Sequence, residues 1–218
     1  VNSDCLKPEN MCSLLSKVSP CLKTNIFAML VLYIIVKFID LIFPKRCVIC
    51  KKLNSYLCEN CFLFLSFDTK SVCLICGKAS FNGLTHQRCR GKYKIDGYFS
   101  ALKLNSTGQK LIYSFKQKQY LLDIKNLLSD LFFESIIQKE NFMMQIEKEN
   151  WIFFFVPLSK ASFRKRGYNQ AEALAKILAQ KFKFEFATDL SQLKNKNVLL
   201  VDDVVFSGKT LKETTKLI

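Results

Sequence analysis

The sequence lacks a hydrophobic segment long enough to cross a membrane and a recognisable cleavable signal peptide. The nearest candidate, residues 26–43, contains an unbroken apolar run of 11 residues, interrupted afterwards by Lys37 and Asp40. A membrane span needs about 20 apolar residues. We therefore expect residues 26–43 to form an amphipathic helix, with membrane contact through 26–43 as the open alternative. Residues 1–25 show no clear periodicity, and we expect the ordered chain to begin near Met29.

Acidic residues are scarce as well. The chain has 18 Asp and Glu against 33 Lys and Arg, and its formal net charge is +15. Thiolates in two zinc sites would lower this to about +12. Such an excess favours polyanionic partners, namely phosphates, nucleic acid or an acidic membrane surface. A general bias toward lysine explains the same composition, and charge alone does not decide between the two interpretations.

Histidine occurs once, inside a compact cysteine pattern. Residues 47–89 hold that histidine and seven of the ten cysteines as four pairs, each with two residues between its members. The pairs are Cys47 and Cys50, Cys58 and Cys61, Cys73 and Cys76, and His86 and Cys89. A gap of two residues lets both side chains point at one metal ion, and zinc takes four ligands tetrahedrally. The pattern predicts two zinc ions in a reducing compartment rather than disulfides.

The simplest assignment of these ligands is sequential. Cys47, Cys50, Cys58 and Cys61 would bind one ion, and Cys73, Cys76, His86 and Cys89 the other. An interleaved assignment fits the same spacing. Each set fills all four positions and leaves none for a catalytic water, so we expect both ions to be structural. Arg88, Arg90, Lys92 and Lys94 lie among and after the last ligands, as a solvated surface or a phosphate-contacting face.

Apolar patterning predicts an α/β architecture after the cysteine module. We expect strands at 93–104, 151–156 and 198–201, and helices at 106–118, 120–138, 169–182 and 209–218. Residues 139–150 are polar and predict a loop. Strands that alternate with helices are typical of a parallel sheet.

The clearest functional signal follows the strand expected at 198–201. Asp202 and Asp203 stand at its carboxyl end, where open α/β sheets bind ligands. Ser207, Gly208, Lys209 and Thr210 follow, and their amides and hydroxyls suit a phosphate. The two carboxylates suit vicinal sugar hydroxyls, with or without Mg²⁺. Adjacent acids also occur in response regulators and metal sites, and the Ser-Gly-x-Thr loop favours a sugar phosphate.

These motifs resemble those of the ComF family, which joins a double zinc ribbon to a phosphoribosyltransferase fold. The family's Val-Asp-Asp-Val-x-Thr-Thr-Gly-x-Thr signature is similar to residues 201–210, Val-Asp-Asp-Val-Val-Phe-Ser-Gly-Lys-Thr. A second family motif, Pro-Leu followed by a basic run and Arg-Gly-Phe-Asn-Gln, resembles residues 157–159 and 164–170. The resemblance covers about residues 36–218, with the elements in the same order.

The resemblance implies a phosphoribosyltransferase-like, Rossmann-like α/β domain, truncated at the C-terminus, behind a double zinc ribbon. The divisions would be a leader and helix at 1–43, the ribbon at 44–92 and the phosphoribosyltransferase-like domain at 93–218. It further implies that Asp202 and Asp203 hold the ribose hydroxyls, and that Ser207, Gly208, Lys209 and Thr210 hold the 5-phosphate. The residues implied near the diphosphate are Pro157, Leu158, Ser159, Arg166, Gly167, Asn169 and Gln170. Lys116 falls where the family tends to carry a lysine.

For function, the resemblance implies a cytoplasmic protein, with membrane association open, that binds phosphoribosyl diphosphate and acts in DNA uptake during natural competence. Its partners would be single-stranded DNA and competence-machinery proteins. One alternative is an active phosphoribosyltransferase, but the sequence reveals neither a general base nor a pocket for an acceptor base. The other is a decayed family member with an idle site. It is favoured by Phe206 in place of a threonine, by the short 183–196 stretch and by the chain's end at Ile218.

Overall fold

The structure, a computed structural model, describes residues 44–91, 93, 95–117, 122–146 and 150–218, with six further positions between 28 and 38. The expected leader at 1–25, most of the expected helix at 26–43, and Lys92 and Lys94 lie outside the described residues. The six described positions before residue 44 are helical. Among the described residues, no helix combines the length and apolar character needed to cross a membrane.

The chain divides into two compact units. One contains residues 1–46 with 52–55, and the other contains residues 47–51 with 56–218. In the first, Arg46 and Leu53 form an antiparallel bridge, and the Asn54 amide donates to the Lys45 carbonyl at 2.9 Å. The second holds the sheet and all eight predicted metal ligands. The boundary expected at residue 92 between ribbon and α/β domain stays a prediction.

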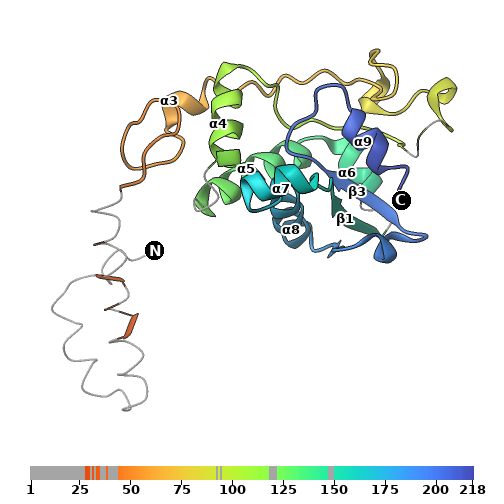
Figure 1. Ribbon diagram of the computed structural model, residues 1–218. Coiled ribbons are helices and arrows are strands. Elements are labelled where there is room, and N and C mark those ends of the chain that lie inside the picture. The colour runs from red at the N-terminus through yellow and green to blue at the C-terminus, as the bar shows by residue number, and fades with distance from the viewer. Residues whose placement is uncertain are drawn as a thin grey trace, which may run out of the picture. The chain divides into compact units, whose positions relative to one another are not determined.

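Among the described residues, the second unit contains a parallel sheet of three strands in the order β2–β1–β3, and Figure 1 shows β1 beside β3. The strands are β1 (Trp151–Phe155), β2 (Glu185–Phe186) and β3 (Asn197–Val201). β1 pairs with β3 over its full length, from Trp151 opposite Asn197 to Phe155 opposite Val201. Central strands of parallel sheets are buried on both faces, which explains the continuous apolar run of β1. The predicted parallel α/β fold is confirmed, as are the strands expected at 151–156 and 198–201.

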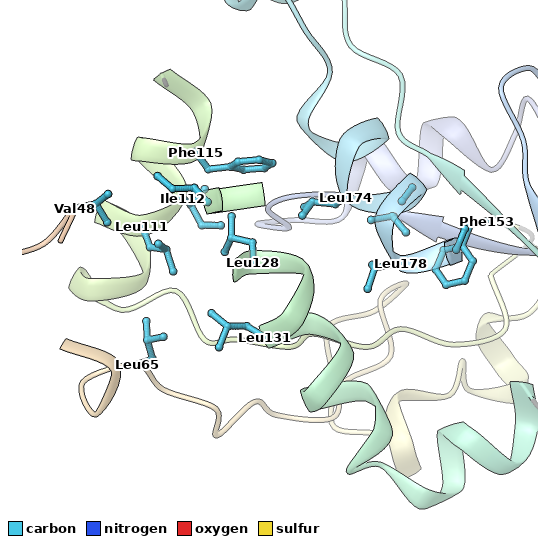
Figure 2. Close-up of a cluster of buried hydrophobic side chains, with 14 residues drawn as sticks. Val48, Leu65, Leu111, Ile112, Phe115, Leu128, Leu131, Phe153, Leu174 and Leu178 are labelled. Atoms are coloured by element: carbon cyan, nitrogen blue, oxygen red, sulfur yellow. The ribbon is translucent and has the colours of Figure 1, made fainter. Parts of the chain in front are cut away.

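Helices cover one face of this sheet. The expected helices form as α4 (Ser106–Gln117), α5 (Leu122–Ile137) and α8 (Gln170–Phe182). Because alternate strand residues face opposite sides, Phe153 and Val201 point into this helical layer. Figure 2 shows Phe153 near Leu174 and Leu178 of α8. This cluster also contains Val48 and Leu65 of the cysteine module.

The opposite face carries the alternate strand residues. Ile152 and Phe154 pack there against Leu193, which belongs to the 3₁₀ helix η5 (Leu190–Leu193). Val156, just past β1, packs against Leu211 of α9 (Lys209–Thr214), which is shorter than expected. Helical segments thus pack on both faces of the sheet. Because β1 and β3 are parallel neighbours, their carboxyl ends lie side by side at one edge of it.

Two predictions of local structure are wrong, and one helix forms where no element was predicted. The described residues of 93–104 form no strand; Gly97 and Lys103 make isolated bridges to Leu84 and Ser66. A stretch of alternating apolar and polar residues forms a strand only where a continuous neighbouring strand pairs with it. The cysteine module offers single bridges instead. The loop expected at 139–150 contains α6 (Glu140–Ile146), which packs on α5 and buries Ile146. The additional helix is α7 (Lys160–Arg166).

The boundaries of α7 follow from its local residues. The Ser159 hydroxyl oxygen accepts a hydrogen bond from the Ser162 amide at its start. Gly167, with a φ of 76°, ends it in the left-handed region. This helix places its cations next to the end of β1.

Candidate functional site

The eight predicted zinc ligands gather into two sets. Cys47, Cys50, Cys58 and Cys61 form one, and Cys73, Cys76, His86 and Cys89 form the other. Within each set the ligand atoms all lie within 4.8 Å of one another. This is the sequential assignment, and the interleaved one does not occur. Thiolate sulfur and imidazole nitrogen in fours are the donors of structural zinc, so the residues fit two such ions.

The first knuckle of each set has the same local fold. The Lys51 amide donates to the Cys47 carbonyl at 2.9 Å, and the Gly77 amide donates to the Cys73 carbonyl at 2.8 Å. Lys51 and Gly77 both have positive φ, 68° and 71°, which turns the chain back toward the metal ligands. The two ribbons are therefore built on one repeated turn.

The same turns prepare two thiols for metal binding. Burial raises the pKa of the Cys47 and Cys73 thiols, but backbone N–H donors around each sulfur outweigh burial and lower both pKa values to about 6. These donors include Ile49 and Cys50 in the first knuckle, and Ile75 and Cys76 in the second. A lowered thiol pKa favours the thiolate, which is the form that binds zinc.

His86 is held in the orientation of a metal ligand. Its Nε2 donates to the Ala79 carbonyl oxygen at 3.0 Å, which leaves Nδ1 with the free lone pair. Nδ1 lies 3.3 Å from the Cys76 sulfur, inside the second set. All seven cysteines of the two sets are free of disulfides. His86 therefore completes the second set through Nδ1.

A second cluster forms at the carboxyl end of β3, around the adjacent residues Asp202 and Asp203. The Asp203 carboxylate forms an ion pair with Lys116 of α4, with Oδ2 and Nζ 3.1 Å apart. The Asp203 side chain is only 10% exposed, so this pair is weakly screened by solvent. Asp202 Oδ1 accepts a hydrogen bond of 2.8 Å from the Asp203 amide. Lys116 thus balances the charge of one of the two carboxylates directly.

The other carboxylate keeps its proton more readily. Burial raises the pKa of Asp202 to about 6, and the charge of Asp203 adds to this effect. Asp202 in turn contributes to a raised pKa of Tyr98, which burial mainly causes. Asp203 contributes in the same way to the raised pKa of Tyr168. The two tyrosines therefore lie near different members of the acidic pair.

The loop after these acids encloses a small cleft. The cleft has a volume of about 110 Å³ and is lined by Asp202 and residues 204–211. Ser207, Gly208, Lys209 and Thr210, all predicted to hold the 5-phosphate, belong to this lining. The Lys209 amide donates to the Ser207 hydroxyl at 3.4 Å. Phe206 is 87% exposed and contributes no apolar contact to the core.

The predicted diphosphate residues come from the end of β1 and the turn between α7 and α8. The Val156 amide donates to the Val201 carbonyl at 2.9 Å, which holds Pro157, Leu158 and Ser159 beside the end of β3. Asn169 is buried, and its side chain connects the end of β1 to the start of α8. Its Nδ2 donates to the Val156 carbonyl at 3.0 Å, and its Oδ1 caps α8.

Gln170 is buried as well, at 1% exposure, and its Oε1 accepts from Arg166 Nη1 at 3.0 Å. Within the described part of the chain, its Nε2 has no hydrogen-bond partner. Asn169 and Gln170 thus support the turn, and their direct contact with a ligand stays a prediction. Gly167 and Ser159 are exposed at the two ends of α7.

Beside this turn lies a larger cavity that the sequence did not reveal. It has a volume of about 490 Å³. Its lining consists of Phe155, Pro157, Leu158, Lys160, Phe163, Arg164, Asn169 and Glu172. The lining joins strand, turn and two helices that only the folded chain brings together, and α7 was not among the expected elements. No short motif in the sequence marks such a cavity.

Comparison with known families assigns a domain class to two parts of the chain. Residues 38–90 match the double zinc ribbon domain, and residues 154–218 match the phosphoribosyl transferase domain. The chain therefore combines a double zinc ribbon with a phosphoribosyltransferase-type α/β domain. This combination is consistent with a ComF-like architecture. Searches of curated proteins and of solved structures returned no match.

The paired sets lead to a prediction about metal content. Freshly reduced protein should carry about two zinc ions per chain, because each set supplies four tetrahedral ligands. His86→Ala should weaken zinc binding at the second set only, since His86 belongs to that set alone. Metal analysis and competition with a chromogenic chelator measure both quantities.

The neighbouring substitution Gln87→Ala is the control, because Gln87 is exposed and supplies no ligand. It should leave both ions bound. Less than one zinc ion per wild-type chain, or loss of both ions in His86→Ala, would contradict the assignment.

Proposed function

We propose that this protein binds phosphoribosyl diphosphate, or a related phosphoribosyl ligand, at the carboxyl end of β3. The observation that carries the proposal is the cleft that Asp202 and the 204–211 loop form in a phosphoribosyltransferase-type domain. In this arrangement Asp202 and Asp203 accept hydrogen bonds from the ribose hydroxyls. The Ser207–Thr210 loop donates to the 5-phosphate through amides, hydroxyls and the Lys209 ammonium group.

Lys116 adds a positively charged group to the site. In the free protein its ammonium group is paired with Asp203. A ligand that carries a diphosphate would offer Lys116 a second anionic partner, and an accompanying Mg²⁺ would offer Asp203 a second cation. Two adjacent carboxylate groups with oxygen donors fit Mg²⁺, which prefers such ligands together with substrate phosphates.

The test of the proposal is a calorimetric titration with phosphoribosyl diphosphate and Mg²⁺. Wild-type protein should bind, and Asp202→Asn with Asp203→Asn should abolish binding, because amides replace charged acceptors with partly donating groups. The matched control is Asp189→Asn with Asp68→Asn, two exposed acids that do not belong to the carboxyl end of β3. Equal binding by wild type and the Asp202/Asp203 double variant would refute the site.

The raised pKa of Asp202 predicts how binding depends on pH. A carboxyl group whose pKa is about 6 carries a proton below that pH and accepts sugar hydroxyls less well. Affinity should therefore rise as the pH increases through about 6 and level off above it. Asp202→Asn should lose this step, whereas titration of the ligand's own phosphates affects both proteins equally. Identical pH profiles for the two proteins would contradict the assignment.

A transferase is the second candidate, and the 490 Å³ cavity is what favours it. Its volume is in the range of small-molecule sites, and its lining pairs apolar side chains with Lys160, Arg164 and Glu172. An acceptor base bound there would lie beside the turn proposed for the diphosphate. Release of pyrophosphate in the presence of a nucleobase, with loss in Glu172→Gln, distinguishes this candidate from binding alone.

We further propose that the protein contacts single-stranded nucleic acid in the cytoplasm, as incoming DNA during natural competence. Support comes from the net charge of +15 and from α7, where Lys160, Arg164 and Lys165 are exposed. Phe163, 50% exposed on the same helix, offers a stacking surface. Tyr168 is less suited, because its ring packs edge-on against Phe115 and its hydroxyl donates to the Phe115 carbonyl.

The prediction concerns the salt dependence of DNA binding. Replacing Lys160, Arg164 and Lys165 by Ala should weaken binding and flatten the log–log salt slope by up to about 2, since each neutralised phosphate on a single strand contributes about 0.7. Arg166 is left unchanged because it holds Gln170. Fluorescence anisotropy with a labelled oligonucleotide at several salt concentrations measures both effects.

The charge-matched control replaces Lys78, Lys176 and Lys194, which are exposed and lie outside α7. It should change the slope less than the α7 variant. A slope that is the same in the α7 variant and in wild type would place the nucleic acid on another surface.

A further inference from the structure

The second ribbon touches the loop proposed to bind the 5-phosphate. Its first knuckle, residues 73–76, carries Leu74 and Ile75 between the two cysteines. A Cβ atom built on Gly208 would lie 2.6 Å from Leu74 Cδ1 and 2.9 Å from Leu74 Cγ. The Leu74 side chain therefore occupies the space that any other residue at 208 would need for its Cβ. Gly208 also has a φ of 68°, in the left-handed region that favours glycine.

Lys212 of α9 forms a polar link across the same contact. Its Nζ donates to the Ile75 carbonyl oxygen at 3.4 Å and to the Ser207 carbonyl oxygen at 3.3 Å. One ammonium group thus connects the backbone of the knuckle with the backbone of the loop. The Lys212 amide donates to the Gly208 carbonyl at 2.9 Å, which starts α9.

An apolar cluster surrounds these contacts. Leu74 packs there with Ile95, Val156 and Leu211, all of which are buried. The cluster joins the knuckle, the end of β1 and α9 on the face of the sheet opposite α8. Val205 from the middle of the loop packs against it.

The loop is restrained on both sides by apolar contacts, since Val204 packs against the cluster that contains Phe153 and Val205 packs against the cluster that contains Leu74. In the part of the chain that the structure describes, the hydrogen bonds made by the backbone of 204–208 run to α9 and Lys212, and none runs to a strand. Hydrogen bonding to the sheet therefore does not hold the loop amides in position, and the contacts with the knuckle contribute to their position.

From these contacts we infer that the second zinc-binding knuckle positions the phosphate loop, with Leu74 and Lys212 as positioning residues for the phosphoribosyl ligand. Leu74 supports the loop at Gly208, and Lys212 ties Ser207 to Ile75. Amides held in place before the ligand arrives bind it more tightly, because their ordering is already complete. The ligand named here rests on the proposed function, whereas the packing itself does not.

The chain offers a matched control for Leu74. Val48 occupies the same place in the first knuckle, between Cys47 and Cys50, and is likewise buried. It packs into the cluster around α4 and α5 instead of against the loop. Val48→Ala therefore loosens a ribbon contact of the same kind at a different place.

The first experiment measures amide hydrogen exchange of residues 204–211 in the ligand-free full chain. Leu74→Ala should speed exchange there by about tenfold or more, since local opening becomes easier when a supporting contact is lost. Val48→Ala should leave it unchanged. Lys212→Met keeps the apolar stem and should also speed exchange, which covers the case that Leu74→Ala fails to fold. Unchanged exchange in the folded variants, or an equal rise in Val48→Ala, would overturn the inference.

The second experiment titrates the same variants with phosphoribosyl diphosphate and Mg²⁺, after metal analysis shows that each retains its zinc. The dissociation constant should rise about tenfold in Leu74→Ala and Lys212→Met and stay unchanged in Val48→Ala. Equal affinity in all variants would refute the positioning role. If the wild type does not bind the ligand, the proposed function fails, and hydrogen exchange alone decides whether the knuckle holds the loop.

Discussion

The parallel pairing of β1 with β3 is the constraint on which the rest of the site depends. It sets the Pro157–Ser159 turn beside Asp202 and Asp203, although more than 40 residues separate them in the sequence. Just past the paired residues, Asp203 forms an ion pair with Lys116 of α4, and Asp202 lies near Tyr98. The two adjacent acids thus have different neighbours.

The cysteine module contains the same turn twice, once in the first knuckle of each ligand set. The two turns pack against different parts of the α/β domain. The knuckle that contains Val48 joins the cluster around α4 and α5. The knuckle that contains Leu74 joins the cluster of α9 and the end of β1. A metal ion held by all four ligands of a set would keep each knuckle rigid without a large apolar core of its own. The two ribbons can therefore support two separate surfaces of the α/β domain.

Local features were the most predictable from the residues. The pairs of metal ligands, the helices α4, α5 and α8, and the strands β1 and β3 depend on spacing or periodicity within a few residues. The strand expected at 93–104 failed because its alternation found only Leu84 and Ser66 as isolated partners. The helix α6 was missed because its contact with α5 outweighs the polarity of residues 139–150. Tertiary packing overrides weak local preference in both cases.

The sequence by itself determined the zinc-ligand spacing and the acidic strand end with its Ser-Gly-Lys-Thr loop, since each is written within a short stretch of chain. Only the tertiary structure decided that the ligand sets are sequential, that Lys116 pairs with Asp203, and that a cavity opens beside Phe163. It also decided that Leu74 lies against Gly208, 134 positions further along the chain. Such contacts depend on the packing of distant segments, which no local pattern specifies.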